Sequence, residues 1–82
     1  MNKYFKNLAK YLAKQKKPQD MEKFLRAILT PQELEAIPKR LEIVKMLKQG
    51  VSQREIADKL GLGIATVTRG SRELKKGNFK DV

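Results

Sequence analysis

The sequence predicts an all-α fold, a small helical bundle that contains a helix-turn-helix. Apolar residues recur at spacings of three and four along most of the chain, which is the period of an amphipathic helix. Ser52 with Glu55, and Thr30 with Glu33, each have the spacing of a capping box at a helix start. Gly61 lies between two short helical patterns. Glycine readily takes the left-handed conformation that ends a helix, so Gly61 is expected to form the turn between them.

The composition indicates one small basic domain, residues 1–82, with an anionic partner. The 82 residues include 19 Lys and Arg against 9 Asp and Glu, a net charge of +10. Such a charge suits nucleic acid or a membrane surface. No apolar run approaches the roughly 20 residues of a transmembrane helix, and the lysine-bearing start lacks a signal-peptide pattern. A cytoplasmic protein is therefore expected.

Cysteine and histidine are absent from the sequence. This removes disulfides, thiolate and imidazole chemistry, and most zinc sites. The acidic residues stand singly along helix faces, so no constellation for acid–base or metal chemistry is seen. We expect no enzymatic activity and no metal. A chain this short buries a modest core, and a homodimer is the expected reinforcement.

Residues 1–17 predict an amphipathic helix with a basic outer face. Its lysines lie opposite an apolar stripe formed by Tyr4, Phe5, Leu8, Tyr11 and Leu12. A basic amphipathic helix can lie on a membrane, but a short, aromatic-rich stripe equally suits packing against another helix. The lysines are either a solvated face or face DNA. Pro18 is expected to end the helix, with residues 16–19 as a short link.

Two further helices complete a dimerisation and core segment, residues 1–50. Asp20 is expected to cap a short helix from Met21 to about Leu29. Thr30 then caps a long helix that ends at Gly50. Its apolar stripe keeps phase across Pro38, so we expect one kinked helix rather than two. The stripe consists of Leu34, Ile37, Leu41, Val44 and Leu47, widened by Ile43 and Met46.

Residues 51–76 predict the helix-turn-helix. One helix starts after Ser52 and stops at Gly61, and a second restarts near Gly63 or Ile64. The inward-facing residues are expected to be Ile56, Ala57, Leu60, Leu62 and Val67. The second helix is rich in β-branched residues and glycine, so its intrinsic propensity is low. Its short side chains would let the backbone approach a DNA major groove. A helical hairpin with a solvated basic face is the structural alternative.

The run QREIADKLGLGIATVTRGSRELK resembles the DNA-reading segment of the Trp repressor family, whose signature is Q-R-E-[LI] followed by G-x-G-I-A-T-[IV]-T-R-G-S. With LTPQELEAIPKRLEIVKML, the resemblance covers about residues 28 to 75. It implies an intertwined all-helical homodimer that represses transcription at a double-stranded DNA operator. That family normally has another helix after the basic stretch. We expect this helix to be missing or reduced to a short tail at 77–82, with Phe79 docked on the core.

The expected DNA contacts fall into two groups. Arg54, at the start of the first reading helix, is expected to contact a guanine. Arg72 and Lys75 are expected at phosphates. The other residues expected to face the groove are Gln53, Ile64, Ala65 and Thr68.

The resemblance also implies a site for the corepressor L-tryptophan between the core and the reading helix. In the family the indole lies between two arginines, which match Arg40 and Arg69. Where family members have a serine that hydrogen-bonds the ligand ammonium, this chain has Glu73. The remaining matched positions are Thr30 at the carboxylate, the carbonyls of Ala27 and Leu29 near the ammonium, and Ile43, Thr66 and Gly70 as walls.

Glu73 has two interpretations. As a ligand group, its carboxylate would pair with the ammonium more strongly than a hydroxyl does. As a structural residue, it stands four positions after Arg69 and would form an ion pair within the helix. The low helix propensity of residues 63–70 suggests that the reading helix is loosely held in the dimer without ligand. The hypothesis is that a ligand between Arg40 and Arg69 selects the orientations that can bind DNA. The alternative function is a helix-turn-helix regulator that needs no small ligand or answers to a different effector.

Overall fold

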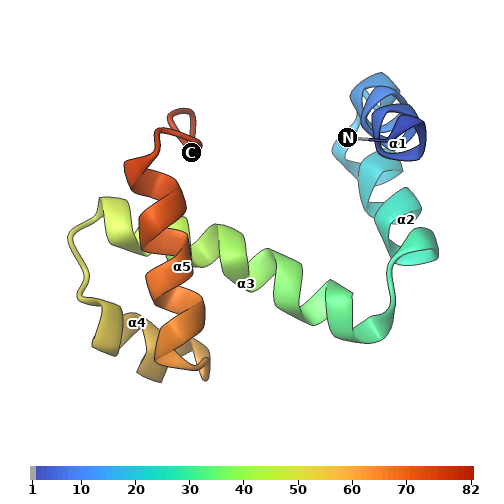
Figure 1. The fold of residues 1–82 in the computed structure, drawn as a ribbon. Helices are drawn as coiled ribbons and strands as arrows, with labels where there is room; N and C mark the ends of the chain where they lie inside the picture. Colours follow the sequence, from blue (N-terminus) through green and yellow to red (C-terminus); the bar gives the residue numbers. More distant parts are fainter. Residues whose placement is uncertain (1) are drawn as a thin grey trace. The chain divides into compact units, whose positions relative to one another are not determined.

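The computed structural model describes residues 2–82, which form five α-helices and no strand (Figure 1). The all-α prediction is therefore confirmed. The chain divides into two compact units, Met1–Leu34 and Glu35–Val82. The helices are α1 (Lys3–Lys14), α2 (Pro18–Ile28), α3 (Pro31–Lys48), α4 (Gln53–Leu60) and α5 (Ile64–Lys75). None of the helices described in 2–82 combines the length and the apolar character needed to cross a lipid bilayer.

In the first unit, α1 packs against α2 through aromatic side chains. The Asn2 side chain caps α1 by accepting a hydrogen bond of 2.9 Å from the Phe5 backbone N–H. The ring centroids of Tyr11 and Phe24 lie 4.6 Å apart, a distance typical of favourable aromatic pairs. Neither helix contains a buried residue, and Tyr4 remains 73% exposed. Much of the apolar stripe predicted for α1 is therefore uncovered within one chain.

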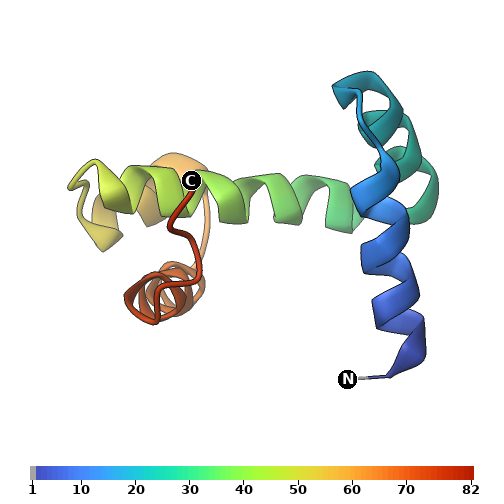
Figure 2. The ribbon, with the colours of Figure 1, turned by 90° about the horizontal axis from the view of Figure 1, so that it is seen from above.

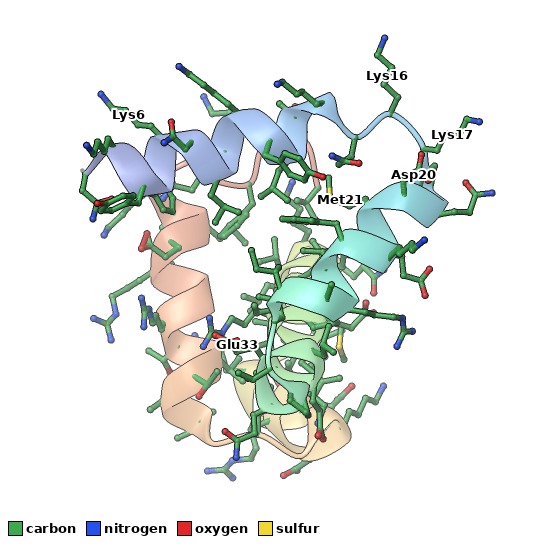
Figure 3. The ribbon with its side chains drawn as sticks, turned by 90° about the vertical axis from the view of Figure 1, so that its right-hand side faces the viewer. Lys6, Lys16, Lys17, Asp20, Met21 and Glu33 are labelled. Carbon is green, nitrogen blue, oxygen red and sulfur yellow. The ribbon has the colours of Figure 1, made fainter. Side chains whose placement is uncertain are left out.

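The prediction for the start of α2 was wrong. Pro18 is the first residue of α2 rather than part of a link, and Asp20 lies in the first turn rather than at the cap. Proline suits this position because the first helical N–H has no partner within the helix and the ring presets φ. Asp20 still lies near the positive end of the helix dipole. Figure 3 shows the side chains of Lys6, Lys16 and Lys17 extending away from the two helices.

The capping box of α3 forms as predicted. The Glu33 N–H donates to Thr30 Oγ1 over 3.2 Å, and the Thr30 N–H donates to Glu33 Oε1 over 2.8 Å. The hydrogen bond from the Thr30 backbone, followed by that with its side chain, holds the pKa of Glu33 below its ordinary value. The helix then runs unbroken through Pro38, as one helix rather than two.

The second unit has its core where α3, α4 and α5 meet. Ile43 of α3, Ile56 and Ala57 of α4, and Val67 of α5 form one buried cluster. Gly61 has a φ of 65° and ends α4, and the N–H groups of Gly61 and Leu62 both donate to the Ala57 carbonyl. The partly buried residues around the cluster are Met46, Leu47, Val51, Leu60 and Leu62. The predicted helix-turn-helix packing is thus present.

The helices α3 and α5 cross (Figures 1 and 2), and Gly70 of α5 lies close to Ile43 of α3. A Cβ added to Gly70 would lie 2.9 Å from Ile43 Cγ2, closer than real Cβ contacts allow. Only glycine therefore fits without a shift at this crossing. The presence of a poor helix former in the middle of α5 has a packing reason.

The tail, residues 77–82, returns from α5 towards α3, as Figure 2 shows. Gly77 has a φ of 88°, and its N–H donates to the Leu74 carbonyl while the Asn78 N–H donates to that of Glu73. These two bonds form a Schellman motif, which favours glycine. The tail is made of turns, and its Phe79 is partly buried.

Candidate functional site

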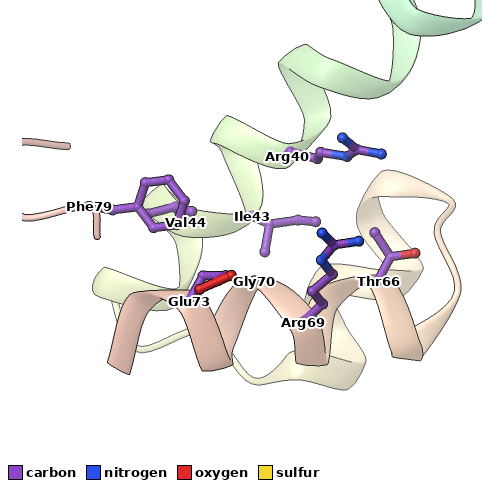
Figure 4. Close-up of a pocket in the computed structure, with 8 residues that line it drawn as sticks. All are labelled: Arg40, Ile43, Val44, Thr66, Arg69, Gly70, Glu73 and Phe79. Carbon is purple, nitrogen blue, oxygen red and sulfur yellow. The ribbon is translucent and has the colours of Figure 1, made fainter. Parts of the chain in front are cut away.

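A cavity of about 260 Å³ lies between α3 and α5. Six of the predicted ligand-site residues line it: Arg40 and Ile43 from α3, and Thr66, Arg69, Gly70 and Glu73 from α5 (Figure 4). The volume is slightly below the roughly 300–1,000 Å³ usual for ligand pockets. It therefore suits a ligand of the size of an amino acid.

The cavity has a cationic end and an apolar end. Figure 4 shows the guanidinium groups of Arg40 and Arg69 on one side of Ile43, and the Phe79 ring beside Val44 on the other. The four ion pairs among residues 2–82 involve neither arginine. Both guanidinium groups can therefore offer their charge and their planar faces to a ligand.

Glu73 is engaged by the chain that follows it. Its Oε2 lies 3.5 Å from Lys76 Nζ and accepts a hydrogen bond of 3.1 Å from Asn78 Nδ2. The ion pair with Arg69 considered above is not formed in the described part of the chain. Glu73 is thus held by the tail while it lines the cavity, and Arg69 keeps its charge free.

Three predicted ligand residues belong to the first unit and are not among the residues that line the cavity. Ala27 lies in α2, and Leu29 is the C-cap of α2. Thr30 uses its hydroxyl to accept the capping bond of α3. Any ligand carboxylate at Thr30 would therefore share a hydroxyl that already has a structural role.

Two lining residues, Val44 and Phe79, were not among the predicted site residues. Val44 was predicted only as part of the α3 stripe, although it adjoins Ile43 in sequence. Phe79 was expected on the core. Its presence in the cavity depends on the turn at Gly77, and no local pattern gives the direction of that turn.

The residues predicted to contact DNA lie on α4 and α5. Arg54, Ala65, Arg72 and Lys75 are exposed, and Ile64 is 52% exposed. Gln53 and Thr68 are partly buried, and the Thr68 hydroxyl donates to Gln53 Oε1 over 2.7 Å. This bond joins the start of α4 to the middle of α5. A second hollow, lined by Ala65, Arg69, Arg72, Glu73 and Lys76, adds Lys76 to the basic side chains on this surface.

Comparison with known proteins identifies the family. The family model described as "Trp repressor protein" matches residues 3–81. The chain is 46% identical over 76 residues to a Trp operon repressor homolog of Vibrio vulnificus (strain YJ016), covering 92% of this chain and 72% of that protein. A homolog from Xylella fastidiosa (strain M23) is 41% identical over 78 residues, 94% of this chain and 85% of the relative. One from Vibrio cholerae is 54% identical over 55 residues, 66% of this chain and 53% of the relative. The chain belongs to the Trp repressor family, a family of DNA-binding transcriptional repressors without enzymatic activity.

Proposed function

We propose that this protein is a cytoplasmic homodimer that represses transcription by binding a double-stranded DNA operator, with L-tryptophan as its corepressor. The observation that carries the proposal is the pair Arg40 and Arg69, which lines one cavity from two different helices. Neither arginine has an acidic partner among residues 2–82. The pair therefore offers a cationic slot of suitable size for the ligand.

The chemistry of the cavity fits an aromatic amino acid. A planar indole gains attraction from guanidinium groups on its faces, and a carboxylate accepts bidentate hydrogen bonds from arginine. Glu73 supplies the negative charge for the ammonium, and Ile43 with Thr66 and Gly70 supplies walls. An ammonium at Glu73 would compete with Lys76 for the carboxylate. The main-chain carbonyls of Ala27 and Leu29, with the hydroxyl of Thr30, remain further proposed ligand contacts from the first unit.

The homodimer is supported by apolar side chains that one chain leaves open. They are Tyr4 at 73% exposed, Phe5 at 54%, Tyr11 at 47%, Ile28 at 52%, Ile37 at 42% and Leu41 at 46%. All belong to α1, α2 and α3, the segment proposed to form the dimer. Burial of these side chains against a second copy would also set two reading helices about one DNA turn apart.

The proposed mechanism links the ligand to the orientation of α5. Because Arg40 is on α3 and Arg69 is on α5, a ligand held by both favours one placement of the two helices. The ligand thereby increases the fraction of molecules that have this placement, and the apparent DNA affinity rises in proportion to that fraction. Arg54 reads a guanine, Gln53, Ile64, Ala65 and Thr68 face the groove, and Arg72 and Lys75 contact phosphates.

The test is DNA binding with and without L-tryptophan. Duplexes selected from a random pool and unselected duplexes are titrated by fluorescence anisotropy, while calorimetry measures ligand binding to the protein alone. The proposal predicts saturable ligand binding and a gain in affinity confined to selected DNA. Arg40→Gln and Arg69→Gln should abolish the gain. Tight DNA binding that is indifferent to millimolar L-tryptophan would refute the corepressor role.

A regulator that needs no small ligand is the second candidate. It is favoured by the Thr68 to Gln53 hydrogen bond, which holds α5 on α4 by the chain's own contacts. If this candidate holds, Thr68→Val should lower DNA affinity about equally with and without L-tryptophan. If the ligand orders α5, the loss should be larger without it.

A further inference from the structure

The tail is fixed to the second unit at several points. Lys48 Nζ, on α3, donates to the carbonyls of Lys80 over 3.2 Å and of Val82 over 2.7 Å. At the other end, the Schellman turn at Gly77 and the bond from Asn78 Nδ2 to Glu73 Oε2 join the tail to α5. Phe79 lies between these two anchors. Its side chain is therefore positioned by contacts on both sides.

The ends of the cavity differ in what they can accept. Figure 4 shows Arg40 and Arg69 at one end, Glu73 and Gly70 near the middle, and Phe79 at the other end. In the proposed function the ligand ring lies between the arginines and its ammonium lies at Glu73. The space beyond the nitrogen is then closed by Phe79 together with Val44.

We propose that Phe79 is a specificity-determining residue, which restricts the site to amino acids with an unsubstituted amino group. This inference rests on the proposed function for the identity of the ligand. The position of Phe79 does not depend on the ligand: Lys48 holds the tail, and Phe79 forms one wall of the cavity. Lys48 is accordingly a positioning residue for this wall.

The experiment compares L-tryptophan with Nα-methyl-L-tryptophan, which keeps the positive charge and adds one methyl group. Calorimetry gives both dissociation constants for the wild type, Phe79→Ala, Lys48→Met and the matched control Phe79→Leu. The wild type should prefer L-tryptophan by roughly 10-fold or more, the usual discrimination for one methyl group in a shaped pocket. Phe79→Ala should reduce this preference to about 3-fold or less, Lys48→Met should reduce it in part, and Phe79→Leu should keep most of it.

A second readout separates this inference from the proposed function. Nuclear Overhauser contacts between the Phe79 ring and the methyl groups of Ile43 or Val44 report the wall without any ligand. They should be present in the wild type and weakened in Lys48→Met, and circular dichroism checks that each variant is folded. Unchanged ligand preference in folded Phe79→Ala would overturn the specificity role. Binding of neither ligand by the wild type, with the ring contacts present, would overturn the proposed ligand and retain the wall. Absence of the ring contacts in the wild type would overturn the wall.

Discussion

Gly70 sets how closely α5 packs on α3. Alanine at this position would gain about 1 kcal/mol of helix propensity. Its Cβ, however, would lie 2.9 Å from Ile43 Cγ2, and overpacking of this kind costs about 1–3 kcal/mol. Gly70→Ala should therefore lower the free energy of unfolding in urea. It should also weaken the binding of L-tryptophan, because a shift of α5 displaces Arg69. Gly63→Ala is the control, because nothing lies within 4 Å of the added Cβ. Equal ligand affinity in Gly70→Ala and wild type would contradict this account.

The Glu73 carboxylate is shared between the proposed ligand ammonium and Lys76. Replacing it with glutamine removes the charge but keeps the shape, so a charge-assisted bond to the ammonium becomes a neutral one. L-tryptophan should bind roughly 10-fold more weakly to Glu73→Gln, a change of about 1.4 kcal/mol. Lys76→Met should act in the opposite direction, because it removes the cation 3.5 Å from the same carboxylate. Calorimetry on both variants tests this, and opposite signs are the required result.

At the scale of elements, the capping box makes the start of α3 sensitive to acid. Hydrogen bonds from the Thr30 backbone and then its side chain lower the pKa of Glu33 in the folded chain. The carboxylate thus contributes stability above the ordinary pKa of about 4.3, and this contribution is lost as pH falls through the lower, folded pKa. Urea unfolding from about pH 6 downwards should show a smaller acid loss in Glu33→Gln than in wild type. Glu35→Gln, which changes a carboxylate paired with Lys39, is the control. It should lose as much free energy of unfolding on acidification as the wild type does.

Helix starts with capping boxes could be predicted because their signals are local. Thr30 with Glu33 and Ser52 with Glu55 place the starts of α3 and α4. Both predicted bonds of the first box are present; in the second, the Glu55 N–H donates to Ser52 Oγ, while the Glu55 carboxylate pairs with Lys59. The start of α2 was predicted wrongly from Pro18, because proline is compatible both with the end of one helix and with the first position of the next. The arginine pair followed from the family pattern. The contribution of Phe79 did not, because it depends on contacts between the tail and Lys48, more than 30 positions earlier.

At the scale of the whole molecule, the open apolar stripe predicts that one chain does not act alone. Leu41 is 46% exposed on α3, and a lysine there would have to be desolvated in the proposed dimer interface. Leu41→Lys should shift sedimentation equilibrium towards the monomer and lower the melting temperature. Ile64→Lys is the matched control, because Ile64 is 52% exposed on the proposed reading surface. That variant should remain as dimeric as the wild type.

The net charge of +10 and the exposed arginines predict two kinds of DNA contact that salt can separate. A phosphate contact contributes about 0.9 to the slope of log affinity against log salt, whatever the sequence. Arg72→Ala should therefore weaken selected and unselected duplexes alike and reduce the slope by roughly 1 per chain. Arg54→Ala should instead weaken the selected duplex more than the unselected one, by about 1–3 kcal/mol for one lost bidentate base contact. Both variants change charge equally, so they control for each other in anisotropy titrations at several salt concentrations. Identical losses on both duplexes for both variants would show that Arg54 does not read a base.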